Sequence, residues 1–236
     1  MLNQRSRAHA NLRMMEFVAR KLGKLKDEFV FLGGCATALF INDASVPDIR
    51  ATMDVDCITD VLSLVHYHQL EKKLISHGFK KSIQDDVICR WHYEDVILDV
   101  MPTDENILGF GNRWYKAAIK ENLVHHIAHD LSLKSVTAPY FLATKFEAFK
   151  SRGNNDYYMS HDFEDIISVI DGRAQIVDEV KNADMTLKNY LQEIFSELLI
   201  NEHFLSALPG HINYGSSTHD RTNMVLDRIK QMAKIL

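Results

Sequence analysis

The spacing of apolar residues changes near residue 137, and this change constrains the fold more than any other feature of the sequence. Before it, short apolar or alternating runs at 29–32, 53–59, 87–93 and 95–101 predict strands, and weaker ones at 123–136 predict one or two more. The runs 87–93 and 95–101 are close enough in sequence to form a hairpin. After it, only helical spacing recurs, and we expect helices over 139–152, 161–171, 174–183, 187–208 and 222–236. An α/β part at 1–137, opening with an N-terminal helix, and a helical part at 138–236 are therefore predicted.

The bulk composition fits an ordinary globular chain. Its 236 residues are 46% hydrophobic, which is enough for one large domain or two small ones. Cys35, Cys57 and Cys89 form no C-x-x-C pair, so they are expected to be buried thiols and not a zinc site or disulfide framework. No stretch resembles a secretory signal or a membrane span, and we expect a cytoplasmic protein.

A glycine pair, Gly33 and Gly34, stands between the apolar run 29–32 and a short helix expected over 35–41. Paired glycines let a backbone approach a phosphate closely, and the N–H groups at a helix start attract an anion. A tight turn is the other explanation, because turns are the common use of glycine. The pair is a candidate phosphate site.

Two carboxylates, Asp54 and Asp56, lie on the alternating run at 53–59. Side chains alternate on a strand, so both point to the same face. Neighbouring carboxylates repel each other and are costly to desolvate, and a shared divalent cation removes that cost. The alternative is the exposed polar face of an edge strand.

A third acid, Asp99, interrupts the apolar run at 96–101. A lone carboxylate in so apolar a strand needs either a partner or a metal ion. A structural salt bridge is the alternative to a metal ligand, because buried acids are usually paired.

A lysine, Lys145, lies in the apolar stripe of the helix expected over 139–152, on the face of Phe141 and Phe149. Its stem either covers the core while its ammonium reaches water, or the ammonium reaches inward to a triphosphate with help from Arg152. Asp162 and Asp165 share one face of the next helix. Either acid is placed to orient Lys145 or Arg152, or to act on an acceptor, although the helix dipole alone favours acids there.

Strand, Gly-Gly, helix, D-x-D strand and a later single acid together resemble the nucleotidyltransferase fold of the polymerase-beta-like superfamily. The segments GGCATALF, RATMDVD and LDVMP resemble its AbiEii-like branch, which includes toxin components of abortive-infection and toxin–antitoxin systems. The long interval from Gly34 to Asp54 and the R-x-T/S-x-D-x-D form with Arg50 and Thr52 resemble the same branch. A K…R…S-x-D-x-x-D-I pattern extends the resemblance, which covers about residues 29–173.

The resemblance implies an α/β (α+β) fold: a mixed-sheet nucleotidyltransferase core, followed by a C-terminal helical region that contributes Lys145 to the site. It implies two Mg²⁺ ions, or Mn²⁺ in their place, held by Asp54, Asp56 and Asp99, with ATP or another NTP as substrate. The glycine pair is expected to cradle the β- and γ-phosphates. The full set of NTP-binding positions is Gly33, Gly34, Arg50, Thr52, Lys145, Arg152, Asp162 and Asp165.

The expected reaction moves a nucleoside monophosphate from the NTP to an acceptor hydroxyl. The resemblance favours tRNA or other RNA, or a protein, as acceptor, with a cognate antitoxin as a partner and no membrane. One alternative is a small-molecule acceptor, as in aminoglycoside nucleotidyltransferases, and another is a catalytically silent NTP-binding or interaction module. The formal net charge of -5 suits a cationic acceptor and weakly disfavours a large duplex-RNA footprint.

Overall fold

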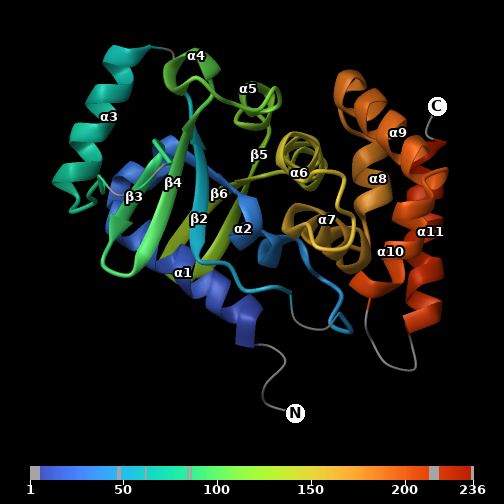
Figure 1. Cartoon of the computed structure of the whole chain (residues 1–236). Coiled ribbons are helices and arrows are strands. Elements are labelled where there is room, and N and C mark those ends of the chain that lie inside the picture. Colours follow the sequence, from blue (N-terminus) through green and yellow to red (C-terminus); the bar gives the residue numbers. More distant parts are fainter. Residues whose placement is uncertain are drawn as a thin grey trace. The chain divides into compact units, whose positions relative to one another are not determined.

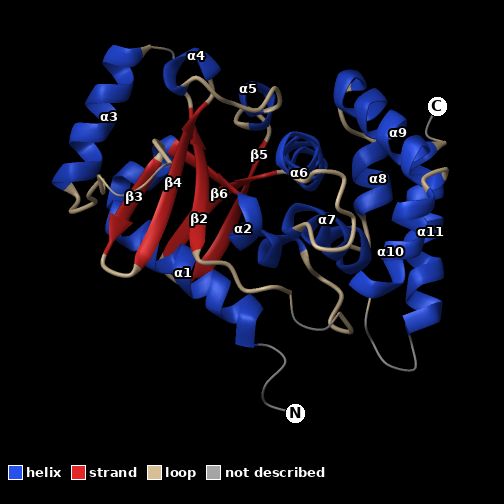
Figure 2. Ribbon diagram, viewed as in Figure 1, coloured by secondary structure: helices blue, strands red, loops and turns tan. Residues whose placement is uncertain are grey.

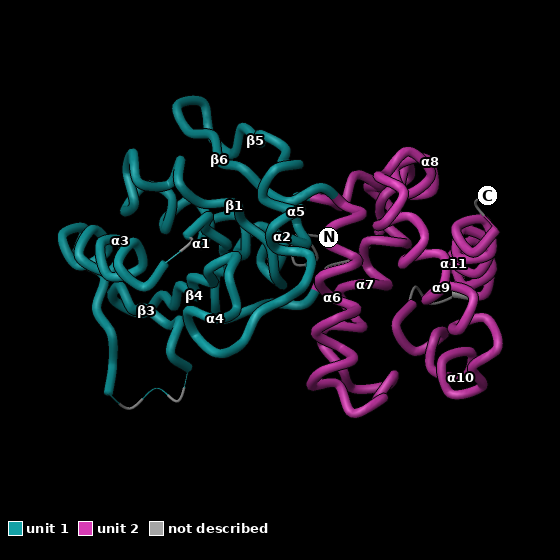
Figure 3. The backbone as a smooth tube through the Cα atoms, turned by 90° about the horizontal axis from the view of Figure 1, so that it is seen from above, with its two compact units in different colours: residues 1–39, 50–137 teal, residues 40–49, 138–236 magenta. Residues whose placement is uncertain are grey.

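The computed structural model describes residues 6–46, 49–61, 63–83, 85, 87–212 and 218–234. The chain divides into two compact units, coloured separately in Figure 3. Unit 1 comprises residues 1–39 and 50–137, and unit 2 comprises residues 40–49 and 138–236.

A mixed sheet of six strands, in the order β3-β4-β2-β1-β6-β5, forms the centre of unit 1 (Figures 1 and 2). The strands are β1 (Phe29–Leu32), β2 (Asp54–Thr59), β3 (Arg90–Tyr93), β4 (Val96–Pro102), β5 (Asn122–Ala128) and β6 (Leu131–Val136). Strand β1 is antiparallel to β2 and parallel to β6, while β2 is parallel to β4. Hairpins β3–β4 and β5–β6 complete the two sides. The α/β class and the mixed sheet expected from the sequence are confirmed.

Helix α1 (Ser6–Leu22) packs across the sheet and contacts β2, β4, β5 and β6 (Figure 1). Its Met15, Val18 and Leu22 are fully buried, as the helical spacing predicts. A 3₁₀ turn (Gly23–Glu28) leads into β1, and α2 (Gly33–Phe40) follows β1 directly. The remaining helices of unit 1 are α3 (Leu64–Ser76), α4 (Glu105–Leu108) and α5 (Tyr115–Ala118). Helices α4 and α5 are too short to be predicted from the spacing of apolar residues.

Unit 2 is helical in its described part after residue 137. It contains α6 (Ala138–Arg152), α7 (His161–Gly172), α8 (Ile176–Lys181), α9 (Met185–Leu199), α10 (Glu202–His211) and α11 (Thr218–Ala233). Aromatic rings of Phe149, Tyr157, Phe163 and Phe204 pack together, with the Phe149 and Tyr157 centroids 5.0 Å apart. These rings connect α6, α7 and α10 through one apolar core.

The segment 40–49 groups with the helices of unit 2, although it lies between α2 and β2 in the chain. The amide N–H groups of Asn42 and Asp43 both donate to the carbonyl oxygen of Gly172, at 2.9 and 3.0 Å. The Arg221 guanidinium donates hydrogen bonds to the carboxylates of both Asp43 and Asp171. These contacts with α7 and α11 hold the segment, and they join residues that are far apart in sequence.

The single helix expected over 187–208 is wrong, because the chain forms α9 and α10 with a break at Ile200 and Asn201. The Asn201 side chain accepts a hydrogen bond from the Phe204 amide at 3.0 Å and caps α10. The end expected at residue 208 is three residues too early, since α10 continues through Pro209 to His211. Apolar spacing continues across a cap, so periodicity alone does not show where one helix ends.

All three cysteines are buried and carry free thiols, as expected. None of the helices in the part of the chain that the structure describes is both long enough and apolar enough to cross a membrane.

Candidate functional site

The three carboxylates predicted to act together lie on one face of the sheet of unit 1. Parallel pairing of β2 with β4 places Asp56 beside Asp99, and antiparallel pairing of β3 with β4 places Arg90 on the other side of Asp99. Residues paired across neighbouring strands share a face, and Asp54 shares it because it is two residues from Asp56. Strand β2 has neighbours on both sides, so the edge-strand alternative for its acids is wrong.

Arg90 forms a two-pronged ion pair with Asp99. Its Nε lies 2.9 Å from Oδ1 and its Nη2 lies 2.7 Å from Oδ2 of Asp99, and Nη2 is also 3.6 Å from Oδ2 of Asp54. The side chain of Asp99 is only 9% exposed, and hydrogen bonding to its carboxylate raises the pKa of Arg90 above its ordinary value. The salt-bridge alternative for Asp99 is therefore present in the structure.

Sequence reasoning missed Arg90, which lies within the expected strand at 87–93. The signal that was available is the hairpin itself. If the chain turns at Glu94 and Asp95, residue 90 pairs with residue 99, as the structure shows. An arginine opposite a lone acid in an apolar hairpin indicates an ion pair.

Gly33 touches the acid face directly. It has a φ of +75°, and a Cβ placed on it would lie 1.9 Å from Oδ2 of Asp56. Both the left-handed backbone and the space require glycine here. Gly33 and Gly34 are the first residues of α2, so the carboxylate of Asp56 lies over a helix start, where N–H groups lack partners within the helix.

Helix α1 holds the segment that leads into β2. The amide of Asn11, which is 1% exposed, donates to the carbonyl oxygen of Arg50 at 3.1 Å and accepts from the Thr52 N–H at 3.3 Å. The Thr52 hydroxyl donates to Oδ1 of Asp54 at 2.6 Å. Asn11 therefore positions Thr52, and Thr52 orients Asp54. Asn11 was also missed, because a polar residue in an amphipathic helix has no distinctive pattern.

Four of the predicted residues form a cluster in unit 2, namely Lys145, Arg152, Asp162 and Asp165, whereas the glycines, Arg50, Thr52 and the three acids belong to unit 1. Lys145 Nζ lies 2.9 Å from Oδ1 of Asp162 and 2.6 Å from Oδ2 of Asp165. Arg152 binds both oxygens of Asp162, at 2.8 and 3.0 Å. Lys145 is 6% exposed, so the alternative in which its ammonium reaches water is wrong. A role for the cluster in NTP binding stays a prediction.

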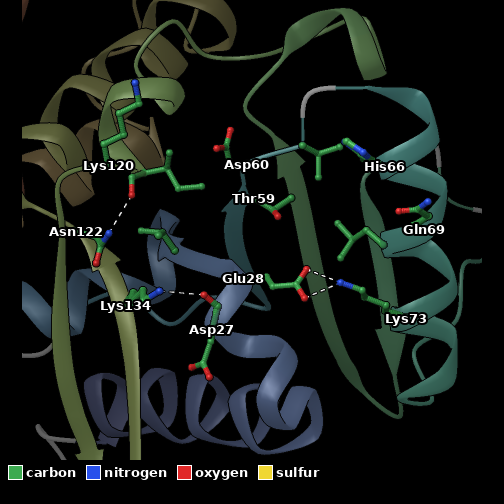
Figure 4. Close-up of a pocket in the computed structure, with 14 residues that line it drawn as sticks. Asp27, Glu28, Thr59, Asp60, His66, Gln69, Lys73, Lys120, Asn122 and Lys134 are labelled. Carbon is green, nitrogen blue, oxygen red and sulfur yellow. Dashed lines mark hydrogen bonds and ion pairs between the residues drawn. The ribbon is translucent and has the colours of Figure 1, made fainter.

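A pocket of about 490 Å³ lies at the other end of the strands (Figure 4). Its lining includes Glu28, just before β1, and Thr59, the last residue of β2, whereas the acid face lies where β1 ends and β2 begins. Lys73 is 2.6 Å from Glu28, and Lys134 donates to the Asp27 carbonyl oxygen, so these lysines are engaged within the pocket. The pocket contains none of the site residues predicted from the sequence.

No family model and no curated protein matches this chain. Its structure is similar to that of an antigenic nucleotidyltransferase-like protein from Paracoccidioides brasiliensis, with a TM-score of 0.51 and 19% identity over 84% of this chain and 92% of that one. It is also similar to JHP933 from Helicobacter pylori, with a TM-score of 0.51 and 11% identity over 97% of this chain and 93% of that one. These likenesses show a nucleotidyltransferase-like fold.

The contact between Gly33 and Asp56 predicts that Gly33→Ala is more damaging than backbone strain alone explains. Gly109 has a φ of +77° and open space at its Cβ position, so Gly109→Ala reports the strain by itself. We expect Gly33→Ala to lower the free energy of unfolding by about 1–3 kcal/mol more than Gly109→Ala, since the methyl group must displace the Asp56 carboxylate. Urea unfolding measures both, and equal losses would contradict the contact.

The buried cluster predicts that Lys145→Met lowers the free energy of unfolding by about 3–5 kcal/mol, because the buried carboxylates of Asp162 and Asp165 lose the ammonium that they share, while Arg152 continues to bind Asp162. The control is Lys150→Met in the same helix, where an exposed ammonium lies 5.2 Å from the Tyr190 ring centroid. That change should cost less than about 1 kcal/mol. Similar losses in the two variants would show that the Lys145 ion pairs do not stabilise unit 2.

The lowered pKa of Asp162 predicts that the free energy of unfolding falls in acid. Burial raises the pKa of Asp162, but the hydrogen bond from Arg152 and the charge of Lys145 outweigh it and lower the pKa to about 2. A carboxylate whose pKa is lowered by folding adds stability above its unfolded pKa, and this is lost as the pH falls from about 4 towards 2. Wild type should lose about 2 kcal/mol more than Asp162→Asn over this range, as measured by urea unfolding at each pH. Parallel curves would contradict the assignment.

Proposed function

We propose that this protein is a metal-dependent nucleotidyltransferase that moves a nucleoside monophosphate from an NTP to an acceptor hydroxyl. The observation that carries the proposal is the alignment of Asp54, Asp56 and Asp99 on one face of the sheet, against the glycine start of α2. The similarity of its fold to that of the nucleotidyltransferase-like protein from Paracoccidioides brasiliensis supports it. Carboxylates beside a helix start bring a cation site and a phosphate site together.

The donor chemistry of this face fits Mg²⁺ or Mn²⁺, since carboxylate oxygens are the ligands that these ions prefer. In the described part of the chain, however, no three His, Cys, Asp or Glu side chains already converge as a metal site. Asp99 is instead bonded to Arg90 at both oxygens. A pair of bound divalent ions would stabilise the attacking and leaving oxygens of the transfer.

The residues of the chain itself divide the remaining work. Thr52 holds Asp54 in its orientation through the 2.6 Å hydrogen bond. Gly33 keeps the start of α2 open, so that backbone N–H groups of its first turn face the phosphates. Asp99 accepts the proton of the acceptor hydroxyl once its carboxylate is released from Arg90. Arg50 is proposed to bind the pyrophosphate that leaves. Lys145, Arg152, Asp162 and Asp165 remain a separate proposal for NTP binding.

The acceptor proposed is RNA, in particular a tRNA end, or a protein hydroxyl, and a cognate antitoxin is the proposed partner. Both rest on the resemblance of GGCATALF, RATMDVD and LDVMP to the AbiEii-like branch. A second candidate function is a catalytically silent binding module of the same fold. The ion pair between Arg90 and Asp99 favours it, because a permanent pair would deny Asp99 to a metal ion.

A label-transfer assay tests these alternatives. Purified protein is incubated with Mg²⁺ and each of four α-labelled NTPs, with total RNA, with aminoglycosides, or alone. We expect label in one fraction with one base, and its loss in Asp54→Ala. Label in the aminoglycosides would replace the proposed acceptor with a small molecule. A folded protein that transfers no label and binds no NTP would identify the silent module.

The proposal predicts graded losses of transfer on and around the acid face. Asp54→Asn, Asp56→Asn and Asp99→Asn should each lower kcat/KM by about a thousandfold or more, since each removes metal-borne stabilisation of several kcal/mol. Thr52→Val should cost about 10–100-fold, because it only frees Asp54 to rotate. Its control is Thr103→Val, which breaks a comparable 3.1 Å bond to Asp60 at the far end of β2. If Thr52→Val and Thr103→Val lost the same activity, Thr52 would have no specific role.

A further inference from the structure

Arg90 is the one cation that the described contacts place on the acid face at hydrogen-bonding distance from Asp99. It takes both oxygens of Asp99, and its Nη2 lies 3.6 Å from Asp54. These are the oxygen atoms that a divalent ion on this face would need. The guanidinium and the metal ion therefore compete for the same ligands.

Electrostatics makes the competition strong. Asp54, Asp56 and Asp99 share a face, and their mutual repulsion is large in a half-buried site without a nearby positive charge. Arg90 supplies such a charge in a planar fork that matches a carboxylate. A divalent ion supplies twice the charge at a shorter distance. When it binds, the guanidinium loses its ligands and must leave, because a cation held beside a bound metal ion is repelled.

The Arg90 side chain is 23% exposed, so it has a path to water that the 9% exposed Asp99 lacks. A guanidinium that leaves the face can thus be solvated without unfolding the hairpin. A fully buried structural arginine differs from Arg90, because its guanidinium cannot reach water when it loses its partner.

We propose that Arg90 is an internal counter-ion that occupies the acid face in the metal-free protein and is displaced when a divalent cation binds, so that it sets the metal affinity of the site. The inference rests on the proposed function, because it assumes that the acid face binds a metal ion. Arg90 is a positioning residue and takes no part in the bond exchange. It holds the carboxylates of Asp99 and Asp54 when no metal ion is bound, and it makes occupancy of the site by metal depend on the divalent-ion concentration.

The test is Mn²⁺ binding to the metal-free full chain, measured by calorimetry and by electron paramagnetic resonance. If the guanidinium leaves the site free only one-tenth of the time, its removal raises the apparent affinity about tenfold. Arg90→Gln is therefore expected to bind Mn²⁺ about tenfold more tightly than wild type. It should also unfold at a lower temperature without metal and gain more from added Mn²⁺, since the acids then lack their counter-ion.

The matched control is Arg20→Gln. Arg20 forms a similar two-pronged pair with Asp130 in unit 1, at 2.8 Å for each nitrogen, away from the acid face. Its removal should leave the Mn²⁺ affinity unchanged. Arg90→Lys keeps the charge but loses the fork, and it should bind Mn²⁺ more tightly than wild type by a smaller factor. This variant carries the test if Arg90→Gln does not fold.

The outcomes separate this inference from the proposed function. Equal or weaker Mn²⁺ binding by the folded Arg90 variants, with clear binding by wild type, would overturn the counter-ion role and leave the proposed function standing. Tighter binding by these variants, together with no transfer of label under any condition, would support the counter-ion role and remove the proposed reaction. No Mn²⁺ binding by wild type or by the Arg90 variants would overturn both.

Discussion

The parallel register between β2 and β4 is the constraint on which the rest of the acid face depends. It sets Asp56 beside Asp99, and the neighbouring hairpin then adds Arg90 to the same row. A slip of one residue would turn the carboxylates of one strand to the opposite face. The row is stable only when its negative charge is balanced, because two or more carboxylates in one half-buried site raise each other's cost of ionisation.

Several weak forces, each from a different element, keep this face in shape. The start of α2 offers the positive end of a helix to Asp56, and Gly33 makes the close approach possible. The Thr52 hydroxyl fixes Asp54, and Asn11 fixes the backbone that carries Thr52. Rigid support of this kind is what a site needs if charged groups are to stay aligned while a ligand is absent.

The ionic cluster of unit 2 has a different physical character. Lys145 is almost fully buried, and each of its two carboxylate partners comes from α7. Desolvation offsets much of the Coulomb gain in such a cluster, so its main consequence is specificity: α6 and α7 pack in the one arrangement that keeps every charge paired. Exposed Arg152 extends the cluster to the surface, where it holds Asp162 from the solvent side.

The sequence by itself determined the division into strands and helices, the strand–glycine–helix junction and the shared face of Asp54 and Asp56, because these follow from local periodicity and backbone geometry. Only the tertiary structure decided what balances the charges. The pairing of Arg90 with Asp99 depends on the register of the β3–β4 hairpin. Its turn has Glu94 at a φ of +52° and lacks the Asn-Gly sequence that would indicate where the chain turns. The sequence already indicates Asp162 and Asp165 as partners for Lys145, but the segment 40–49 is held by residues more than a hundred positions away. Contacts of this kind depend on how elements pack, which local patterns do not encode.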